Sequence, residues 1–398
     1  MVQPRRILYL GYWGANDVLT ASSVFPSLRC LSAMENVEQI VFCSIERGTT
    51  TATTPELPPK VVHVPLVSKT KSNVLLTKFS DFTRFPIALW KLIKQHNINT
   101  VVCRSALAGG MILSITRLKG IPIIVESFEP HSQYMIDSNV WSKSDPRTRW
   151  ARRMEQRLKR KATWLLPVSE NYRQKLLTEG VPSSKMILIP CTVQTDRFAL
   201  NSMVREDIRK QWNWTGLVVG IYIGKFGGIY YEAEAFEQFR EAFRHFEDRF
   251  ALIILTAQDG VKTLVDQYLR DDISPDRIQV LSVPHDRVVD YLSVADFAFS
   301  TIRPAPSRVY CSPIKHGEYW ANGLPIIVED GIGDDSNIIK RDGGGVILRR
   351  GDYGRAFDQV DAIVKQGRQE IYKDIRSLAI EHRSEEILKD AYKRILAQ

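Results

Sequence analysis

The sequence predicts an α/β fold with two Rossmann-like domains, each built on a parallel sheet covered by helices. The chain has 398 residues, which is long for one hydrophobic core, so two domains are expected. Short apolar runs alternate with helical segments along the chain, the pattern of a parallel sheet covered on both faces. With 44% hydrophobic and 25% charged residues, the composition favours neither a disordered nor a fibrous chain.

The apolar runs fall into two successive sets of expected strands. The first set is Ile7–Leu10, Gln39–Cys43, Val61–Pro65, Thr100–Cys103, Pro122–Val125 and Trp164–Val168; the second is Leu217–Ile223, Phe250–Leu255, Ile278–Leu281, Phe297–Ser300, Pro325–Val328 and Gly344–Leu348. Between them, Ile187–Phe198 ends an apolar strand in a proline and turns polar, which indicates a join. The segment Ile371–Leu396 has helical spacing. We therefore expect domains at 1–195 and 196–375, followed by a C-terminal helix at 376–398.

The net charge limits the classes of binding partner, and the cysteines bear on disulfides and metal sites. The net charge of +9 suits an anionic partner, either a phosphorylated small molecule, an anionic membrane surface or nucleic acid. Nucleic acid is not expected, because no zinc finger or RNA-recognition signature accompanies the charge. The five cysteines are scattered and odd in number, which argues against a disulfide framework or a cysteine zinc site. No run approaches the roughly 20 apolar residues of a membrane span, so we expect a cytoplasmic protein, peripheral at most on the cytoplasmic face of the inner membrane.

In open α/β sheets ligands bind beyond the carboxyl ends of the strands, so the loops after each strand are the candidate sites. The strongest is Cys311–Pro325, CSPIKHGEYWANGLP, which leads into a short helix. Unpaired N–H groups and the positive dipole end at such a helix start suit a pyrophosphate, here near Ser312, Lys315 and Gly317. Glu318, just inside the helix, is suited to accept hydrogen bonds from ribose hydroxyls. The alternative is a capped helix with no ligand.

The loop after the first strand of the second domain is the next candidate. In Tyr222–Tyr230, YIGKFGGIY, the glycines Gly224, Gly227 and Gly228 permit close backbone approach, and Lys225 offers a point charge to a phosphate. The loop has neither the Walker spacing nor the dinucleotide G-x-G-x-x-G pattern, so a purely structural turn stays open.

Two loops of the first domain carry groups suited to an acceptor. In Gly11–Asp17, GYWGAND, Gly11 makes a strand-to-helix turn while Tyr12 and Trp13 offer flat faces to a sugar ring. In Glu126–His131, ESFEPH, the side chains of Glu126, Glu129 and His131 crowd behind a strand. They suit acid, base or anchoring roles; a metal site is the weaker alternative because no second ligand pair is evident.

A basic segment, Arg147–Lys161, has Trp150, Met154 and Leu158 at helical spacing and predicts an amphipathic helix. Its simplest interpretation is a core-facing stripe with solvated arginines opposite. The functional interpretation is contact with anionic lipid headgroups or an acidic acceptor.

Several segments, in order, resemble the retaining GT-B glycosyltransferases of family 4, also called glycosyl transferases group 1. TWLLPVSENYRQKL (Thr163–Leu176), IPCTVQTDRF (Ile189–Phe198), VVDYLSVADFAF (Val288–Phe299), SPIKHGEYWANGLPIIV and GIGDD (Gly331–Asp335) match the family's motifs over almost the whole chain. The resemblance implies two Rossmann-like domains facing across a cleft, and a hexosyl or other glycosyl transfer from a nucleotide-sugar donor. It also implies that the C-terminal helix at 376–398 packs back on the N-terminal domain.

The resemblance also implies roles. Lys225 and Lys315 would neutralise the departing diphosphate, Glu318 would hold the ribose, and the loop Ser282–His285 with Pro284 would receive the nucleobase. His131 would lie near the anomeric centre, so that His131, Lys225 and Glu318 form the catalytic set, with no metal and no other cofactor. The acceptor would be a glycan, a lipid-linked species or another hydroxyl compound in cell-surface polysaccharide or glycoconjugate synthesis.

The chain departs from the family pattern in the linker, where Gln194 replaces the usual aspartate and Cys191 and Thr192 replace Asn-Gly, but the departure that matters is in a pair of glutamates. The family carries two glutamates seven residues apart; Glu318 matches the second, but Tyr310 stands at the place of the first, which contacts the donor sugar. This difference leaves open a non-catalytic sugar- or nucleotide-binding partner subunit. A nucleotide-sugar epimerase that uses Glu126 and Glu129 is a further alternative.

Overall fold

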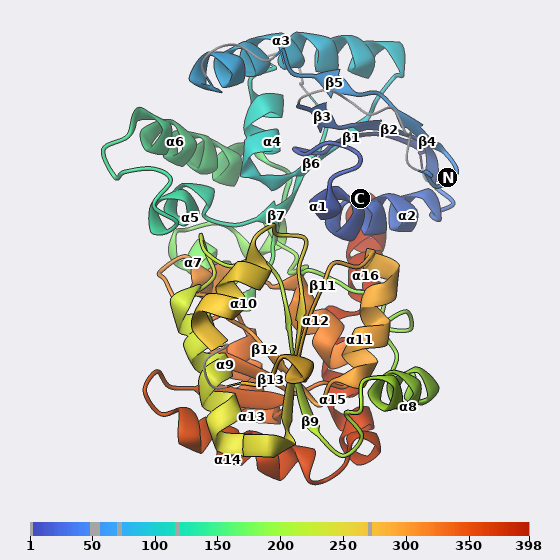
Figure 1. The fold of residues 1–398 in the computed structure, drawn as a ribbon. Helices are drawn as coiled ribbons and strands as arrows, with labels where there is room; N and C mark the ends of the chain where they lie inside the picture. Colours follow the sequence, from blue (N-terminus) through green and yellow to red (C-terminus); the bar gives the residue numbers. More distant parts are fainter. Residues whose placement is uncertain (1–2, 48–55, 70–73, 116–119, 270–272, 398) are drawn as a thin grey trace. The chain divides into compact units, whose positions relative to one another are not determined.

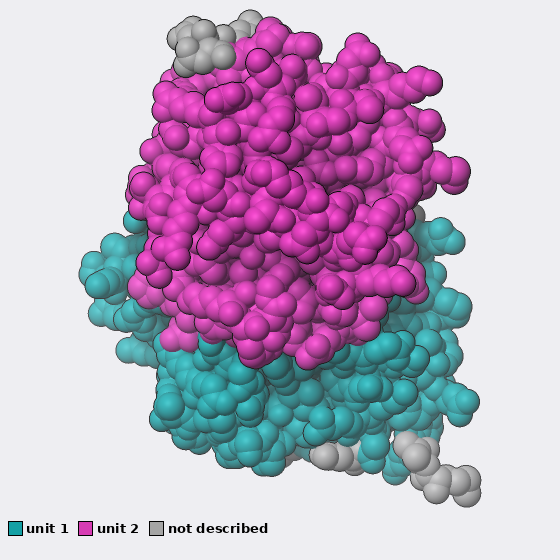
Figure 2. Space-filling view, turned by 90° about the horizontal axis from the view of Figure 1, so that it is seen from below, with its two compact units in different colours: residues 1–192, 385–398 teal, residues 193–384 magenta. Residues whose placement is uncertain are grey.

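The computed structural model describes residues 3–47, 56–69, 74–115, 120–269 and 273–397. The chain forms two compact units (Figure 2). Unit 1 contains Met1–Thr192 together with Glu385–Gln398, and unit 2 contains Val193–Ser384. The sequence-based domain limits at 195 and 375 thus differ from the structural limits, above all at the C-terminal end of the second unit.

Unit 1 is built on a six-stranded sheet in the order β4-β2-β1-β6-β7-β8 (Figure 1). All five strand pairs of this sheet are parallel. The strands are β1 (Arg5–Leu10), β2 (Val37–Cys43), β4 (Val61–His63), β6 (Thr100–Arg104), β7 (Ile123–Phe128) and β8 (Trp164–Pro167). Unit 1 also contains a separate two-stranded sheet, formed by β3 (Ile45–Glu46) and β5 (Leu66–Val67). The sequence did not predict this sheet.

The helices of unit 1 cover this sheet. They are α1 (Val18–Ser23), α2 (Phe25–Ser32), α3 (Val74–Gln95), α4 (Ser105–Leu113), α5 (His131–Asp137), α6 (Pro146–Lys161), α7 (Glu170–Thr178) and the C-terminal α16 (Glu385–Leu396), with a short 3-10 turn η1 (Ser183–Lys185). Leu388, Tyr392 and Ile395 of α16 pack into the same core as Ile7 and Ile40 of the sheet. The last helix therefore belongs to the first unit, although it is the most distant part in sequence.

Unit 2 repeats the architecture. Its sheet has the order β11-β10-β9-β12-β13-β14 with parallel pairs throughout. The strands are β9 (Val218–Ile223), β10 (Phe250–Leu255), β11 (Ile278–Leu281), β12 (Phe297–Phe299), β13 (Ile326–Glu329) and β14 (Gly345–Leu348). The helices are α8 (Ser202–Gln211), α9 (Ala233–Phe246), α10 (Val261–Leu269), α11 (Val288–Val294), α12 (Ile314–Ala321), α13 (Asp335–Asp342), α14 (Tyr353–Val364) and α15 (Arg368–Arg383), with 3-10 turns η2 (Glu247–Arg249), η3 (Pro275–Arg277), η4 (His285–Arg287) and η5 (Arg308–Tyr310).

The predicted fold class is confirmed: each unit is a Rossmann-like parallel sheet whose strands coincide closely with the two predicted sets. Strands buried on both faces read as continuous apolar runs, which is why this signal was clear. None of the helices described here is both long and apolar enough to cross a membrane.

The single helix predicted over Ile371–Leu396 is wrong. The structure has two helices, α15 and α16, separated by Ser384 in an extended conformation (φ −68°, ψ 151°). Ser384 forms a parallel bridge with Val193, and the Val193 N–H donates to the Arg383 carbonyl at 2.7 Å. The chain passes from unit 2 to unit 1 at this point, so strand-like pairing with the other crossing segment replaces a helical turn.

The basic helix α6 faces the core with a different stripe from the predicted one. Thr148, Ala151, Glu155 and Leu158 are its buried residues, whereas Trp150 and Met154 are only partly buried. Met154 and Leu158 nevertheless pack against the glycines of α4, where an added Cβ at Gly109 would come within 2.9 Å of Leu158. Core packing on one side of the helix is therefore present, with arginines on the other.

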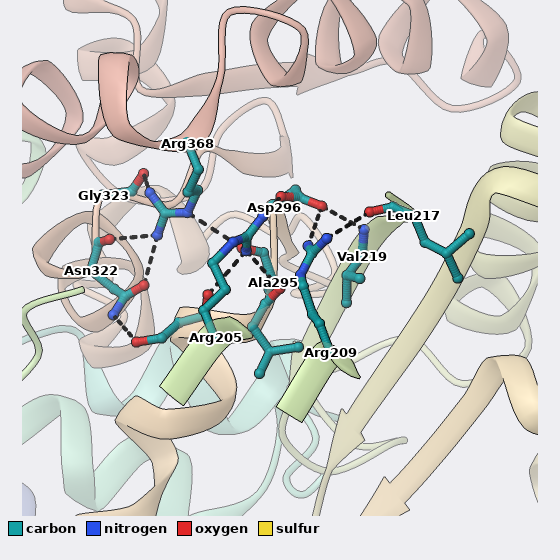
Figure 3. Close-up of polar contacts among 11 residues, drawn as sticks. Arg205, Arg209, Leu217, Val219, Ala295, Asp296, Asn322, Gly323 and Arg368 are labelled. Atoms are coloured by element: carbon teal, nitrogen blue, oxygen red, sulfur yellow. Dashed lines mark hydrogen bonds and ion pairs between the residues drawn. The ribbon is translucent and has the colours of Figure 1, made fainter. Parts of the chain in front are cut away.

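A buried ion-pair network fixes α8 and α15 at the amino edge of the unit 2 sheet (Figure 3). Asp296, directly before β12, pairs with Arg205 and Arg209 of α8 and accepts the Val219 N–H at 2.8 Å. Burial alone would raise the pKa of the Asp296 carboxyl group. The two guanidinium groups nevertheless hold this pKa below its usual value.

Backbone carbonyls complete this network. Arg205 Nη1 donates to the carbonyls of Ser293, Val294 and Ala295 at 2.7–3.0 Å, where α11 ends. Arg368 of α15 donates in the same way to Asn322 and Gly323 beyond the end of α12. Cations at the negative ends of two helices are favourable placements, so one carboxylate suffices for three arginines.

Candidate functional site

Two lysines meet at the carboxyl edge of the unit 2 sheet. Lys225 follows β9, and Lys315 lies in the first turn of α12, after the loop that follows β12. The side chain of Lys315 reaches back over the β9 loop: its Nζ lies 5.1 Å from the ring centroid of Tyr230, and a Cβ added to Gly224 would come within 2.8 Å of this Nζ. The absence of a side chain at Gly224 thus makes room for the second lysine.

Burial is the main cause of a lowered pKa at Lys315. Burial and the positive charge of Lys225 lower the pKa of Lys315 to about 8, with the opposing influence of Glu318 too small to restore it. Lys315 forms no ion pair with any residue that the structure describes. A dianionic group placed between the two lysines would favour the charged form of Lys315 and so offset both effects.

The loop between β9 and α9 is held in one conformation by its own contacts. Gly227 and Gly228 have φ values of 83° and 66°, which glycine adopts without strain. The Tyr222 hydroxyl donates to the Lys225 carbonyl at 2.5 Å, and the Phe226 N–H donates to Gln258 Oε1 at 2.7 Å. The loop conformation therefore requires the glycines for structural reasons. The same conformation places the exposed Lys225 beside Lys315.

Glu318 is buried in α12 and has a partner that the sequence did not reveal. His285 Nε2 lies 2.9 Å from Glu318 Oε1 in a hydrogen bond, and the ring of His285 packs edge-on against Phe198. Pro284 precedes His285 at the start of η4, so the loop after β11 and the carboxylate of α12 are brought together. Sequence analysis had named His285 only as the end of that loop.

A second network lies under the start of α12. His316, fully buried, has Nδ1 2.7 Å from Asp335 Oδ2 and Nε2 2.7 Å from Ser300 Oγ. Arg383 at the end of α15 bonds both Asp335 and the Ser312 hydroxyl. Despite burial, Arg383 and His316 keep the pKa of Asp335 below its usual value. Ser312 is therefore tied to the segment where the chain leaves unit 2.

Gly317, which we expected near a pyrophosphate, is buried where α12 packs closely against neighbouring segments. A Cβ at this position would lie 3.0 Å from Val193 Cγ1 and 3.3 Å from the side chain of Arg383. The residue lets α12 lie close to the crossing segments, and its side of the helix faces the protein interior.

In unit 1, Glu126 lies in a buried hydrogen-bonded cluster. Its Oε2 accepts from the Tyr9 hydroxyl at 2.6 Å, from Ser27 Oγ at 3.2 Å and from Arg104 Nη1 at 3.1 Å. Only 2% of Glu126 is exposed. These contacts join β1, α2, β6 and β7, which gives the carboxylate a structural task at the carboxyl edge of the first sheet.

The aromatic loop after β1 is also held in place. Tyr12 is almost fully buried under the guanidinium of Arg47, 4.6 Å from the ring centroid, while Trp13 is partly exposed and packs edge-on against Tyr12. Glu46 Oε1 accepts the Ala15 N–H at 2.9 Å and so anchors the loop that contains Gly11. Of the predicted pair, Trp13 is the side chain available to a ligand.

His131 is the first residue of α5, behind Glu129, whose carbonyl accepts its N–H at 2.8 Å. Its ring packs edge-on against Trp141 at 5.6 Å. Glu155 of α6 accepts from both the N–H and the hydroxyl of Ser132, at 2.7 and 2.9 Å, and thereby fixes the start of α5. No signal in the sequence could have linked Glu155 to Ser132, the residue after His131.

The predicted donor residues thus all belong to unit 2, where Lys225 lies near Lys315 and the loop with Pro284 and His285 meets Glu318, and the predicted acceptor residues belong to unit 1. Among the residues described, no three His, Cys, Asp or Glu side chains gather in a manner that could hold a metal ion.

Comparisons with known proteins agree with this architecture. The model of Glycosyltransferase Family 4 matches residues 30–197. A search of curated protein sequences finds no match. The segment that matches this family model lies almost wholly in unit 1, and a second Rossmann-like unit follows it.

Solved structures share the fold over nearly the whole chain. Sucrose-phosphate synthase from Thermosynechococcus elongatus is 14% identical with a TM-score of 0.74 and 99% of each chain covered. Anabaena HepE in complex with UDP and glucose is 12% identical, with a TM-score of 0.69 and coverage of 98% of this chain and 99% of that one. UDP-GlcNAc 2-epimerase from Neisseria meningitidis, bound to UDP-GlcNAc, is 12% identical with a TM-score of 0.60, covering 99% and 100%. Two of these structures hold uridine nucleotides, and all three share the fold.

Proposed function

We propose that this protein is a retaining glycosyltransferase that moves a sugar from a nucleoside-diphosphate sugar to a hydroxyl acceptor without a metal ion. The observation that carries the proposal is the pair Lys225 and Lys315, with the pKa of Lys315 lowered to about 8 by burial and by the neighbouring lysine. Two cations at the carboxyl edge of a Rossmann-like sheet, where nucleotides bind in this class of fold, suit a diphosphate.

The chemistry assigned to the pair is stabilisation of the leaving group. As the bond between the anomeric carbon and the phosphate oxygen breaks, negative charge grows on the diphosphate, and the lysines neutralise it. The acceptor oxygen attacks the same face of the sugar, and the departing phosphate oxygen takes the acceptor proton. This sequence needs no protein nucleophile and gives retention.

The other residues bind and orient. Glu318 accepts hydrogen bonds from the ribose hydroxyls, with one carboxylate oxygen held by His285, and the loop with Pro284 receives the base. On the acceptor side we assign orientation of hydroxyls to His131 and contact with the acceptor to Trp13 and Glu129. The acceptor is a glycan or a lipid-linked species, and the product enters cell-surface polysaccharide or another glycoconjugate made in the cytoplasm.

The test is product analysis. The protein is incubated with a panel of nucleotide sugars and candidate acceptors in the presence of EDTA, and both nucleotide release and the anomeric configuration of the product are followed by NMR. We expect retained configuration, activity in EDTA, and a loss of about 100-fold or more in Lys225→Ala and Lys315→Met, the scale of removing one charge-stabilising group. Lys262→Ala, an exposed lysine of α10, is the matched control. An inverted product, or activity abolished by EDTA, would refute the retaining, metal-independent mechanism.

Tyr310 favours one alternative, a non-catalytic subunit that binds a nucleotide sugar. The residue lies in η5, directly before the donor loop, where the family has a carboxylate for the donor sugar. Binding without transfer or slow donor hydrolysis would support this alternative. The buried hydrogen bonds of Glu126 count against the epimerase, and isomer analysis of the recovered donor tests that interpretation directly.

A further inference from the structure

The solvent side of helix α6 consists almost wholly of cations. Arg149, Arg152, Arg153, Arg157 and Arg160 are exposed at spacings of one, three and four residues, and Lys161 follows. The ion pairs of α6 are Arg147 with Asp145 and Lys159 with Glu179. None of the other cations on this helix forms an ion pair with a residue that the structure describes; Arg157 donates only to the Leu113 carbonyl, at 3.5 Å.

Helix α3 adds a second cationic stripe to unit 1. Arg84, Ile87, Lys91 and Lys94 are all exposed and follow one another at intervals of three and four residues, which places them on one face. The two helices meet where Phe82 of α3 and Trp150 of α6 pack edge-on at 4.7 Å, and α4 lies between them (Figure 1). The stripes therefore lie on neighbouring helices of unit 1, and together they are called here the α3–α6 face.

The acidic residues of these helices do not reduce its charge. Each helix contains one acid, and each acid is buried in an internal contact: Asp81 of α3 accepts from the Ser68 hydroxyl at 2.6 Å, and Glu155 of α6 accepts from Ser132. A solvated helix surface usually mixes both signs, which limits repulsion. Here both carboxylates face inward, and only positive charge faces the solvent.

Apolar groups lie among these cations. Ile87 is 60% exposed in the middle of the α3 stripe. Lys94 Nζ lies 4.8 Å from the ring of the partly exposed Trp90, and Val140, just before α6, is 52% exposed. A soluble polyanion offers nothing to an exposed isoleucine, whereas the region of lipid headgroups and upper acyl chains accepts both the cations and the apolar side chains.

We propose that the α3–α6 face binds the surface of an anionic lipid bilayer. The guanidinium and ammonium groups contact lipid phosphates, and Ile87 inserts among the headgroups. Attachment through this face involves neither Lys225 nor Lys315, so the proposal stands independently of the donor chemistry.

The experiment is vesicle co-sedimentation of the full chain. Vesicles of equal parts phosphatidylglycerol and phosphatidylcholine are compared with pure phosphatidylcholine at about 0.05 and 0.5 M NaCl, since exposed charges are screened within a few ångströms at high salt. We expect at least tenfold stronger binding to the anionic vesicles at low salt and most of that preference lost at high salt. Arg152→Gln/Arg153→Gln/Arg157→Gln should weaken binding at least tenfold, as each cation near such a surface contributes roughly fivefold.

Two further variants separate a membrane from other partners. Lys210→Gln/Lys262→Gln/Lys373→Gln removes the same charge from exposed lysines of unit 2 and should bind within about twofold of the wild type. Ile87→Ser should weaken vesicle binding severalfold but leave binding to soluble dextran sulfate unchanged. Melting temperature and nucleotide binding verify folding. Equal binding to both vesicle types, an equal loss in the unit 2 control, or an unaltered Ile87→Ser with equally tight dextran sulfate binding would each overturn the proposal.

Discussion

Unit 2 carries cations at both edges of its sheet, and the two edges differ in how the charge is balanced. At the amino edge, Arg205, Arg209 and Arg368 donate to one carboxylate and to carbonyls at two helix ends. At the carboxyl edge, Lys315 has Tyr230 and Lys225 beside it and forms no ion pair with a described residue. The first group is balanced within the fold, and the second is the pair of cations to which we assign the diphosphate.

The comparison separates stability from binding. Removing a member of a balanced buried network leaves partners unpaired and destabilises the fold. Removing a lysine that is desolvated next to another cation removes the unfavourable free energy of burying its charge, and only a contact to the ligand is lost. The two edges should therefore respond to mutation with opposite signs in stability, and the four predictions below begin with the largest expected effect.

Asp296→Asn should reduce the free energy of unfolding by about 3–5 kcal/mol, because Arg205 and Arg209 would keep buried charges without a carboxylate. Urea denaturation at neutral pH measures this, and Asp374→Asn on the exposed side of α15 is the matched control, expected within about 0.5 kcal/mol of the wild type. Because the pKa of Asp296 is lowered, its stabilisation is present above the unfolded-state pKa near 4 and declines as the pH falls below it. A small effect at neutral pH would show that the amino edge is not a stabilising network.

Lys315→Met should lower nucleoside-diphosphate affinity by about 10- to 100-fold, since one charge-assisted contact is lost. The same variant should have a melting temperature equal to or above that of the wild type, because a desolvated charge is removed. Calorimetric titration and thermal denaturation provide the two values. A marked fall in melting temperature would mean that Lys315 belongs to the structural framework after all.

The pH dependence of nucleoside-diphosphate binding should show that Lys315 must be protonated to bind the ligand. Its folded pKa, about 8, lies below the usual lysine value of about 10.4, so above pH 8 the free protein loses a proton that the bound diphosphate needs. Affinity should fall as the pH rises from 8 towards 10, by up to tenfold per unit, and the fall should vanish in Lys315→Met. The cost of the charged lysine to folding is present below pH 8 and disappears over the same interval. A flat profile in the wild type contradicts the assigned pKa.

His285→Ala should have the smallest effect, a roughly fivefold loss of affinity for a ribonucleoside diphosphate, because Glu318 would lose the partner that orients it. A 2′-deoxyribonucleoside diphosphate should lose less, since it offers the carboxylate fewer hydroxyls. His285→Gln, which keeps a donor, should restore part of the difference. Equal losses for both nucleotides would assign His285 to the base or to folding.

Much of the fold was predictable because its signals are local. Strands buried on both faces appear as apolar runs, and the rule that ligands bind at carboxyl edges singled out Lys225 and Lys315 before their proximity was known. Helical periodicity, by contrast, continues from Leu378 to Ile387, so no local sequence signal predicts the break at Ser384. That break is caused by pairing with Val193, far earlier in the chain.

The site was predictable only in part for the same reason. Gly317 follows the pattern of a phosphate loop, but its absent side chain is required by Val193 and Arg383, contacts that only the folded chain contains. The links from His285 to Glu318 and from Glu155 to Ser132 likewise join residues that are distant in sequence. Residue types at strand ends indicate candidates, and their partners come from packing.

The most direct test of the account is thermal stabilisation by a panel of nucleoside diphosphates and nucleotide sugars, because a ligand that binds only the folded state raises the melting temperature. The account predicts that at least one nucleotide stabilises the wild type and Asp374→Asn in EDTA, and that this shift is lost in Lys225→Ala and Glu318→Ala. No shift with any nucleotide, or an equal shift in all four proteins, would contradict a diphosphate site at the carboxyl edge of unit 2.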